Sequence, residues 1–584
     1  MNSVWTDKVD ASCPLPEYPR PQLVRDNWLN LNGIFSYAVL PQSAEWPAQY
    51  DGEILVPFAI ESQLSGVEKP LLPTQHLWYQ KRFTLPKAMQ GKTVLLHFGA
   101  VDWKCRVYMN RNLVGEHIGG YCAFSLDITP YLLPGENELV VCVYDPTDNG
   151  WQQRGKQVLQ TRGFWYTATS GIWQTVWLEA VSDCYVQSIR YTPDIDEGTV
   201  RLQTALGGAA QDAQLRLTVS FAGETVFSDS IEPDAAVPVP DAKLWSPETP
   251  NLYDVKLEVY KDGVCTDTVT SYFGMRKFCV EKDAAGIARL FLNNKPYFQK
   301  GLLDQGYWPD GGLTAPTDEA MIFDIAEMKR LGFNMLRKHI KVEPLRWYYH
   351  CDRLGMLVWQ DMVSGGAYIG DFFAGVLPNI GILHIPDNKN YARFKRAKPE
   401  WREDFRRELS EILDLLYNTV SLYAWVPFNE AWGQFDALEI CERVRRQDPT
   451  RVVDHASGWY DQGGGDIQSM HKYVLPIRMR RLDDRAFVIT EFGGYSRKVP
   501  GHIWNLKKAF GYLMFPNKEK LTAAYRSLLE KQVIPLVQRG LSGTIYTQVS
   551  DVENEVNGMY TYDRAELKLD EQTVIELNRK LTFE

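Results

Sequence analysis

A short apolar segment followed by two polar residues constrains the fold of this chain more than any other feature. Residues 420–434 read VSLYAWVPFNEAWGQ, and the part up to Phe428 is almost continuously apolar and aromatic. A run of this length and β-rich content is typical of a strand buried on both faces, as in a parallel sheet. Asn429 and Glu430 follow it directly. Because α/β barrels carry their chemistry at the carboxyl ends of the strands, the segment predicts a barrel strand that delivers a glutamate.

A second segment repeats this pattern. Residues 487–490 are again mostly apolar, and Glu491 follows them, ahead of the sequence FGG. A carboxylate after a strongly apolar strand is costly unless it is paired or has a function. We therefore expect Glu430 and Glu491 to face one pocket. The alternative for either residue alone is structural, because polar residues at strand ends often tie loops together.

From residue 278 onward, strand-like and helix-like patterns alternate. Asp318–Leu331 is amphipathic, with Thr317 as its N-cap and Gly332 at its end. Further helices are predicted at 345–354, 401–417 and 435–447. The strand-like segments are 297–302, 334–337, 356–361, 420–428, 451–455, 466–470, 487–491 and 543–548. This alternation predicts an (α/β)8 TIM barrel over residues 278–584, with the last connection long enough for more than one helix.

The first half of the chain predicts two β-domains. Residues 1–180 contain short alternating segments between turn residues, which favours a β jelly-roll sandwich. Residues 181–277 have the length and strand rhythm of an immunoglobulin-like β-sandwich and hold no cluster that suggests chemistry, so a spacer is the better interpretation. The long loop 145–169 carries several aromatic residues, including Trp165. It is either functional or a cover over a neighbouring domain.

Composition argues against several classes of function. The formal net charge is −10 and no basic run is present, which argues against a nucleic-acid partner. No apolar run reaches membrane-spanning length, and the first residues do not resemble a signal peptide. Nine scattered cysteines without CxxC spacing fit a reducing compartment, so a cytoplasmic protein is predicted. A homo-oligomer is compatible with the sequence.

Two facing carboxylates suit the hydrolysis of glycosides. One protonates the leaving oxygen and the other attacks the anomeric carbon, and a separation of about 5–5.5 Å marks the retaining mechanism. Glu430 is predicted as the acid, with its pKa raised by the negative neighbour, and Glu491 as the nucleophile. Arg337 and Tyr473 can keep Glu491 ionised, while Asn429 can bond a sugar hydroxyl. The other polar residues expected near strand ends are His339, Asp361, Asp454, His455, His471 and Gln548. Of these, His339, Asp361, His471 and Gln548 are predicted to bind substrate, together with Asn429, Arg337 and Tyr473.

Other chemistries have weaker support. A metal site is the rival use of His and carboxylates, but HExxH is absent and the histidines lack ligand spacing, so no metal or cofactor is predicted. Gly463-Gly464-Gly465 follows no predicted strand and opens no helix, so we interpret it as a loop and not as a nucleotide cradle. No GxSxG elbow is present.

The chain resembles glycoside hydrolase family 2, the family of bacterial β-galactosidases, β-glucuronidases and β-mannosidases. In the first half the resemblance is carried by residues 28–33 (WLNLNG), 56–57 (VP), 117–121 (HIGGY), 124–130 (FSLDITP), 170–173 (SGIW) and 244–253 (LWSPETPNLY). In the barrel it rests on Asn429-Glu430 and on residues 489–493 (ITEFG). The resemblance covers nearly the whole chain and implies the same three-domain order.

The resemblance also implies roles for single residues. The family's acid/base follows an Asn at the end of strand four, which matches Glu430, and its nucleophile ends strand seven, which matches Glu491. The tyrosine that supports the nucleophile matches Tyr473, although His471-Lys472-Tyr473 can be aligned one place differently. Trp432 is expected to line the same pocket.

Two departures from the family bear on the sugar. Trp165 stands where β-galactosidases and β-glucuronidases place an acidic residue, which offers a stacking surface instead of a polar contact. Where glucuronidases carry an Asn-x-Lys pair for the substrate carboxylate, this chain has Glu555-Val556-Asn557, so an acidic sugar is not expected. Lys341, near strand two, is expected to be a loop or subsite residue.

The resulting hypothesis is a retaining exo-β-glycosidase, with a β-galactoside as the default substrate. A β-glucuronidase, β-mannosidase or arabinosidase of the same family is an alternative. A carbohydrate-binding protein without turnover is the alternative from another class.

Overall fold

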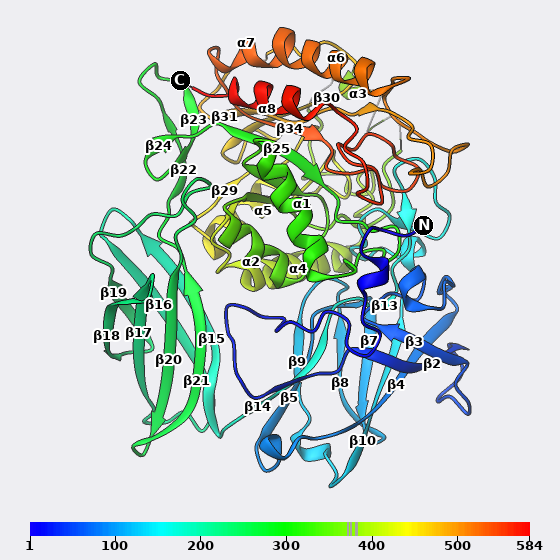
Figure 1. Cartoon of the computed structure of the whole chain (residues 1–584), viewed down its shortest axis with the longest axis vertical. Helices are drawn as coiled ribbons and strands as arrows, with labels where there is room; N and C mark the ends of the chain where they lie inside the picture. The colour runs from blue at the N-terminus through cyan, green and yellow to red at the C-terminus, as the bar shows by residue number, and fades with distance from the viewer. Residues whose placement is uncertain (371–372, 374–376, 380–383, 480, 584) are drawn as a thin grey trace.

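The computed structural model describes residues 1–370, 373, 377–379, 384–479 and 481–583, and it has three domains (Figure 1). The first domain, blue to cyan in the figure, and the second, in green, are β-sandwiches. The third domain, coloured green to red, is a barrel above them. The predicted fold class, a jelly roll followed by an immunoglobulin-like sandwich and a TIM barrel, is confirmed.

Two antiparallel sheets form the jelly roll. One has the order β1 (Trp28–Asn30), β14 (Val176–Val181), β5 (Thr93–Phe98), β9 (Phe124–Asp127). The other has the order β3 (Gly52–Val56), β2 (Gly33–Pro41), β4 (Gln75–Thr84), β10 (Glu136–Tyr144), β7 (Lys104–Met109), β8 (Asn112–Ile118). Strand β7 alternates buried and half-buried residues, as expected for a strand with one face on the core.

The immunoglobulin-like domain is a smaller sandwich. Its sheets are β15 (Cys184–Asp194), β16 (Thr199–Gly208), β19 (Asp234–Pro238) and β18 (Glu224–Ile231), β17 (Gln214–Phe221), β20 (Tyr253–Lys261), β21 (Val264–Phe273). Val255, Leu257 and Val259 of β20 point into its core, and the residues between them are more exposed.

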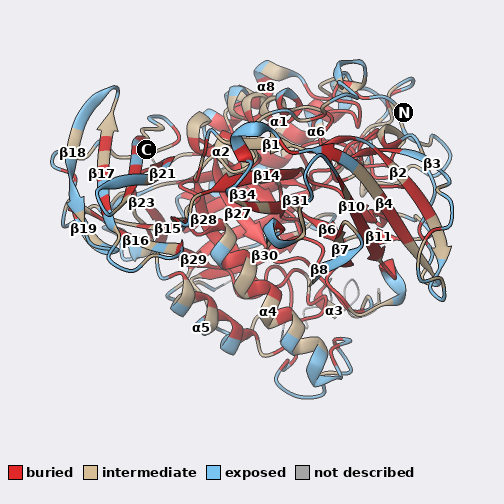
Figure 2. Ribbon diagram, turned by 90° about the horizontal axis from the view of Figure 1, so that it is seen from below, coloured by how far each residue is buried: buried red, intermediate tan, exposed pale blue. Residues whose placement is uncertain are grey.

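Eight parallel strands make the barrel. Their order is β29 (Val452–Val453), β28 (Leu422–Val426), β27 (Leu357–Asp361), β26 (Met335–Lys338), β25 (Gln299–Asp304), β34 (Leu541–Thr547), β31 (Ala486–Gly493), β30 (Ile467–Lys472). Each of the eight predicted strand-like segments overlaps one of these strands. Figure 2 shows the barrel strands as the buried centre of the molecule.

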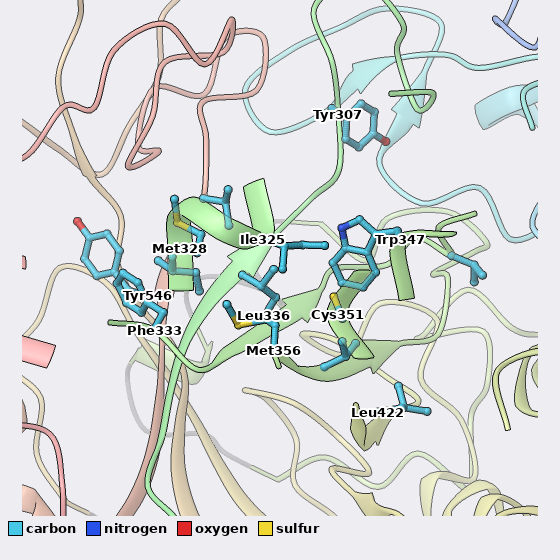
Figure 3. Close-up of a cluster of buried hydrophobic side chains, with 14 of the residues drawn as sticks. Tyr307, Ile325, Met328, Phe333, Leu336, Trp347, Cys351, Met356, Leu422 and Tyr546 are labelled. Carbon is cyan, nitrogen blue, oxygen red and sulfur yellow. The ribbon is translucent and has the colours of Figure 1, made fainter. Parts of the chain in front are cut away.

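Helices cover the outside of the barrel. The first four long ones are α1 (Asp318–Arg330), α2 (Leu345–Leu354), α4 (Pro399–Leu416) and α5 (Ala437–Gln447), all predicted to within about two residues. The Thr317 side chain caps α1 by accepting a hydrogen bond from the Ala320 amide. Figure 3 shows Ile325 of α1 and Trp347 of α2 beside Leu336 of β26, the packing that holds this layer to the strands.

The long connection before β34 contains α6 (Lys518–Leu528), a π-helix (Leu529–Val533) and α7 (Ile534–Val537), and the chain ends after α8 (Glu571–Arg579). At the amino-terminal end of the barrel, the small sheet of β22 (Phe278–Lys282), β23 (Ala288–Leu292) and β24 (Lys295–Pro296) packs its apolar residues against the barrel interior. This apolar packing at the amino-terminal end leaves the carboxyl ends of the strands as the place where we look for a site.

Within the described residues, no helix is long and apolar enough to cross a membrane. All nine cysteines are free, so the fold does not depend on disulfide bonds.

Candidate active site

Glu430 reaches the pocket from a tight turn, and not from the end of a strand. Strand β28 ends at Val426, two residues earlier than predicted. Glu430 and Ala431 have φ values of 46° and 60°, in the left-handed region that side chains other than glycine rarely adopt. The Glu430 amide donates to the Ser457 carbonyl at 3.0 Å, which fixes the turn. Such strained residues cluster at active sites, and the turn here aims the Glu430 side chain into the pocket.

Glu491 lies on β31, where the strand enters the pocket, and is 3% exposed. Arg337 Nη1 donates to its Oε1 at 3.1 Å. The Tyr473 hydroxyl donates to its Oε2. Both carboxylate oxygens are therefore held by donors, as predicted for a carboxylate kept ionised and oriented.

Arg337 fixes the floor of the site. Its guanidinium is fully buried, and all five of its N–H groups have acceptors. Nε and Nη2 bind both oxygens of Asp361 at 2.8 and 3.0 Å, Nη1 binds Glu491 and the Thr490 carbonyl, and Nη2 also binds Asn429 Oδ1 at 2.9 Å. One planar side chain thus sets the relative positions of the Asn429 and Glu491 side chains.

The pKa of Glu491 is lowered to about 2. Burial alone would raise it, but the nearby His471 and Arg337 and the hydrogen bond from Tyr473 outweigh that effect. Glu491 is consequently a carboxylate near neutral pH, the form that a nucleophile needs.

His471 lies between the two carboxylates. Its Nδ1 is 2.7 Å from Glu430 Oε1, and its Nε2 is 3.6 Å from Glu491 Oε1 and 3.1 Å from Ser457 Oγ. The ring itself is buried. One ligand atom from each of Glu430, His471 and Glu491 lies within 4.8 Å of the others, so these three are also the residues that could hold a metal ion.

Glu430 and Glu491 both line a pocket of about 580 Å³. Seven of the predicted site residues line it: Asn429, Glu430, Glu491, His339, Tyr473, Trp165 and Trp432. Burial lowers the pKa of His339, whose Nδ1 lies 2.9 Å from Asp361, so its ring is neutral at physiological pH. Because Nδ1–H then donates to Asp361, Nε2 of the neutral ring can accept a hydrogen bond from a sugar hydroxyl.

Four residues predicted to bind substrate are not among those that line this pocket, and that role stays a prediction for them. These four are Arg337, Asp361, His471 and Gln548. The polar groups of Arg337 and Gln548 are taken by other side chains, and His471 contacts Glu430 instead. Lys341 is also structural, because its ammonium donates to the carbonyls of Gly306 and Leu313 and to Glu343.

The long jelly-roll loop contributes part of the lining. Lys156, Phe164 and Trp165 reach the pocket, and Trp165 packs edge-on against Trp432 with ring centroids 4.9 Å apart. The Arg154 guanidinium lies 5.6 and 5.3 Å from the centroids of these two rings. Loop 145–169 therefore combines the two roles expected from the sequence: it covers the barrel and it lines the pocket.

Some lining residues were missed by sequence reasoning. They are Lys156, Phe164, Leu303, Gln305, Ile340, Tyr368, Tyr512, Thr547 and Glu555. Gln305 follows the first barrel strand, so the strand-end rule could have found it. Tyr512 stacks on Tyr473 with centroids 4.1 Å apart, and nothing in its local sequence indicated this contact.

Three family models match consecutive parts of the chain. They are described as the sugar binding domain of glycosyl hydrolases family 2 (residues 10–181), glycosyl hydrolases family 2 (184–276) and the TIM barrel domain of the same family (287–485). The chain belongs to glycoside hydrolase family 2. The resemblance inferred from its motifs is thereby confirmed.

Among curated relatives, a β-galactosidase of Streptococcus thermophilus is 27% identical over 440 residues, which are 73% of this chain and 39% of that protein. A putative β-glucuronidase of Formosa agariphila is 26% identical over 393 residues, or 65% of this chain and 34% of the relative. This family 2 chain thus matches well under half the length of these two relatives.

Solved structures match over almost the full length. The β-D-glucuronidase of Dictyoglomus thermophilum aligns with a TM-score of 0.76 at 16% identity, covering 97% of this chain and 99% of that one. A β-galacturonidase of Eisenbergiella tayi aligns with a TM-score of 0.71 at 18% identity, covering 97% and 100%. At such identities the likeness concerns the fold.

Proposed function

We propose that this family 2 chain is a retaining exo-β-glycosidase that releases a terminal, non-reducing β-linked sugar. The observation that carries the proposal is the closeness of the two carboxylates: an oxygen of Glu430 and an oxygen of Glu491 lie within 4.8 Å of each other. Retaining enzymes hold their carboxyl groups about 5–5.5 Å apart, whereas inverting enzymes need about 6.5–9.5 Å to admit a water molecule.

In the first step Glu491 attacks the anomeric carbon while Glu430 gives its proton to the departing glycosidic oxygen. This forms a covalent glycosyl-enzyme and releases the aglycone alcohol. In the second step Glu430 takes a proton from water, whose oxygen attacks the anomeric carbon and frees Glu491. Arg337 and Tyr473 hold Glu491 in line for the attack.

The shape of the site supports action at a chain end. The carboxylates lie in a pocket whose wall includes Lys156, Phe164 and Trp165 from the jelly-roll loop. A wall contributed by a second domain leaves room for a terminal sugar and favours this over binding in the middle of a long chain. The aromatic side chains offer faces for the apolar side of a sugar ring.

A β-galactoside is the substrate we propose to test first, because curated relatives such as the Streptococcus thermophilus protein are named β-galactosidase. β-Glucuronides, β-mannosides and arabinosides are the alternatives within the family. The paired carboxylates argue against a carbohydrate-binding protein without turnover, which would have no need of a buried nucleophile.

The test is a mechanism-based label. An activated 2-deoxy-2-fluoro-β-galactoside should inactivate the protein and add one sugar mass to the peptide that contains Glu491. Glu491→Gln should abolish both labelling and turnover, while Glu430→Gln should still be labelled because the activated leaving group needs no acid. Turnover by Glu491→Gln at the wild-type rate would refute the assignment. Activity should also survive dialysis against a chelator, since no step uses a metal.

A further inference from the structure

The carboxylate of Glu555 lies in the pocket wall without a cationic partner. The residue is 3% exposed and lines the same cavity as Glu430 and Glu491. Among the residues that the structure describes, no Lys, Arg or His nitrogen lies within 4.0 Å of it. Burying a carboxylate without a counter-ion costs folding free energy unless hydrogen bonds compensate for the lost hydration, so such a residue is a candidate for a functional role.

Five side chains form a closed ring of hydrogen bonds that holds this carboxylate. Gln305 Nε2 donates to the Tyr166 hydroxyl at 2.7 Å, and that hydroxyl donates to Glu555 Oε2. On the other arm, Gln305 Nε2 donates to Gln548 Oε1 at 2.7 Å, Gln548 Nε2 donates to Asn557 Oδ1 at 2.6 Å, and Asn557 Nδ2 donates to Glu555 Oε1 at 2.9 Å.

The direction of these bonds is the informative point. Both arms begin at the amide of Gln305 and end on Glu555, so every donor in the ring points toward the carboxylate. A network of this kind favours an acceptor at that place and fixes its orientation. Each carboxylate oxygen receives one bond from the ring and keeps a lone pair for a ligand.

We propose that Glu555 is a specificity-determining residue that accepts hydrogen bonds from hydroxyl groups of an uncharged terminal sugar and excludes uronic acids. This inference rests on the proposed glycosidase function. Hydroxyls are the donors that a sugar offers, and hydrogen bonds to a charged acceptor are stronger than those between neutral groups. A uronate carboxylate at the same place would meet a fixed negative charge.

Two cations lie at this pocket, Arg337 behind the nucleophile and Lys156 in the lining. Arg337 is neutralised by Asp361 and Glu491. Lys156 Nζ lies 5.6 Å from the centroid of the Tyr166 ring, the same ring whose hydroxyl binds Glu555. Lys156 and Glu555 thus approach the same Tyr166 side chain, one at its ring and the other at its hydroxyl, so a uronate attracted by Lys156 would also approach the Glu555 carboxylate.

The experiment compares nitrophenyl β-galactoside, glucoside, mannoside and arabinoside with the glucuronide and galacturonide. Wild-type protein should prefer one of the uncharged sugars. Glu555→Gln should lower kcat/KM for that sugar about 10- to 100-fold, the loss expected for a charged hydrogen-bond acceptor, and should raise the uronide-to-neutral ratio. Tyr166→Phe should lower kcat/KM in the same direction by a smaller factor.

Glu553→Gln is the matched control. Glu553 is equally buried and two residues away, but it accepts a hydrogen bond from the Thr167 amide and does not line the pocket. Its kcat/KM should stay within about twofold of wild type, because glutamine keeps the acceptor. Equal losses in Glu553→Gln and Glu555→Gln would reduce the role of Glu555 to folding and overturn the proposal.

A preference of wild-type protein for a uronide would also overturn it, and Lys156→Gln would then show whether that cation binds the carboxylate. These outcomes leave the proposed hydrolysis intact. If no glycoside is cleaved and Glu491 is not labelled, the hydrolysis itself fails. The specificity can still be measured by calorimetric binding of a neutral iminosugar against a uronic acid lactone, where binding of the lactone alone would contradict the proposal.

Discussion

At the scale of single residues, the site depends on how each carboxylate is held. Glu491 has donors on both oxygens and is almost fully buried, whereas the Glu430 side chain is 29% exposed and its carboxylate contacts the buried ring of His471 at 2.7 Å. The nucleophile must stay ionised, while the acid must change its protonation state twice in each cycle. The hydrogen bonds that hold Glu491 suit a nucleophile that stays ionised, and the more exposed position of Glu430 suits an acid that exchanges protons.

We expect His471 to act through Glu430 as a positioning residue. His471→Gln should lower kcat/KM about 10- to 100-fold for an alkyl glycoside, whose leaving group needs a proton, because general acid catalysis contributes factors of this size or more. A 2,4-dinitrophenyl glycoside needs no proton and should lose less than about threefold. Steady-state kinetics with both substrates measures the difference, and equal losses would show that His471 acts through Glu491 or the fold and not through Glu430.

The pH dependence of activity should reveal the task of Arg337. With its pKa at about 2, Glu491 stays ionised above that pH, so the acidic limb of kcat/KM in wild type does not report Glu491. Arg337→Gln removes a charge that lowers this pKa, so Glu491 should protonate at higher pH and the acidic limb should move upward. A pH–rate profile of the two proteins tests this. An unchanged limb would mean that the pKa of Glu491 in Arg337→Gln still lies below that of the group that sets the limb, which would contradict a strong influence of Arg337 on this pKa.

At the scale of elements, two irregular segments complete what the barrel strands begin. The turn after β28 directs Glu430 into the pocket through positive φ angles, and the jelly-roll loop 145–169 adds aromatic walls. Loops can take such conformations because they are not bound to the geometry of a sheet, while the strands beside them stay rigid.

Trp165 should contribute to sugar binding through this loop. Trp165→Ala removes a ring that packs on Trp432 and lines the pocket, so we expect kcat/KM to fall about tenfold, mainly through KM. Trp165→Phe should recover most of the loss. Trp46→Ala is the control, because Trp46 packs on Trp78 in a separate cluster of the jelly roll. Comparable losses in both alanine variants would point to a general loss of stability.

At the scale of the whole molecule, buried ion pairs join the domains. Arg25 is 5% exposed and binds Glu179 on β14 of the jelly roll at 3.0 Å and Asp267 on β21 of the immunoglobulin-like domain at 2.9 Å. Burial would raise the pKa of Glu179, but Arg20, His97 and Arg25 together lower it to about 2. The second domain thus acts as more than a spacer, since it helps to fix the jelly roll whose loop reaches the site.

Arg25→Met should destabilise the protein at neutral pH by about 3–5 kcal/mol, because it leaves the buried Asp267 without its cation and Glu179 with Arg20 alone. Glu179 has a lowered pKa in the folded state, so its stabilising effect is complete above its ordinary pKa of about 4.5 and fades as pH falls toward 2. The difference in Tm between the two proteins should therefore shrink at pH 3.5. A constant difference measured by calorimetry would contradict this account.

Much of the barrel could be predicted because the sequence patterns that indicate its strands and helices are local. The apolar run before Asn429 and the capped helix α1 each carry their own periodicity and end signals. The limits of strands were less predictable: residues 427 and 428 continue the apolar run but belong to the turn that carries Glu430. Backbone dihedral angles in a turn are set by contacts such as the one to Ser457, which local patterns do not encode.

By itself, the sequence determined the three-domain order, the barrel and the two carboxylates at its mouth, because strand patterns and the residues that follow them are local properties. Only the tertiary structure decided how the pocket wall is made. Tyr166 and Glu555 are 389 residues apart and come from different domains, yet they share a hydrogen bond. His471 and Gln548, predicted as substrate ligands, likewise form hydrogen bonds with Glu430 and Gln305, which are distant in the sequence. Such contacts depend on how domains and loops pack, and packing over these separations leaves no periodic trace in the sequence.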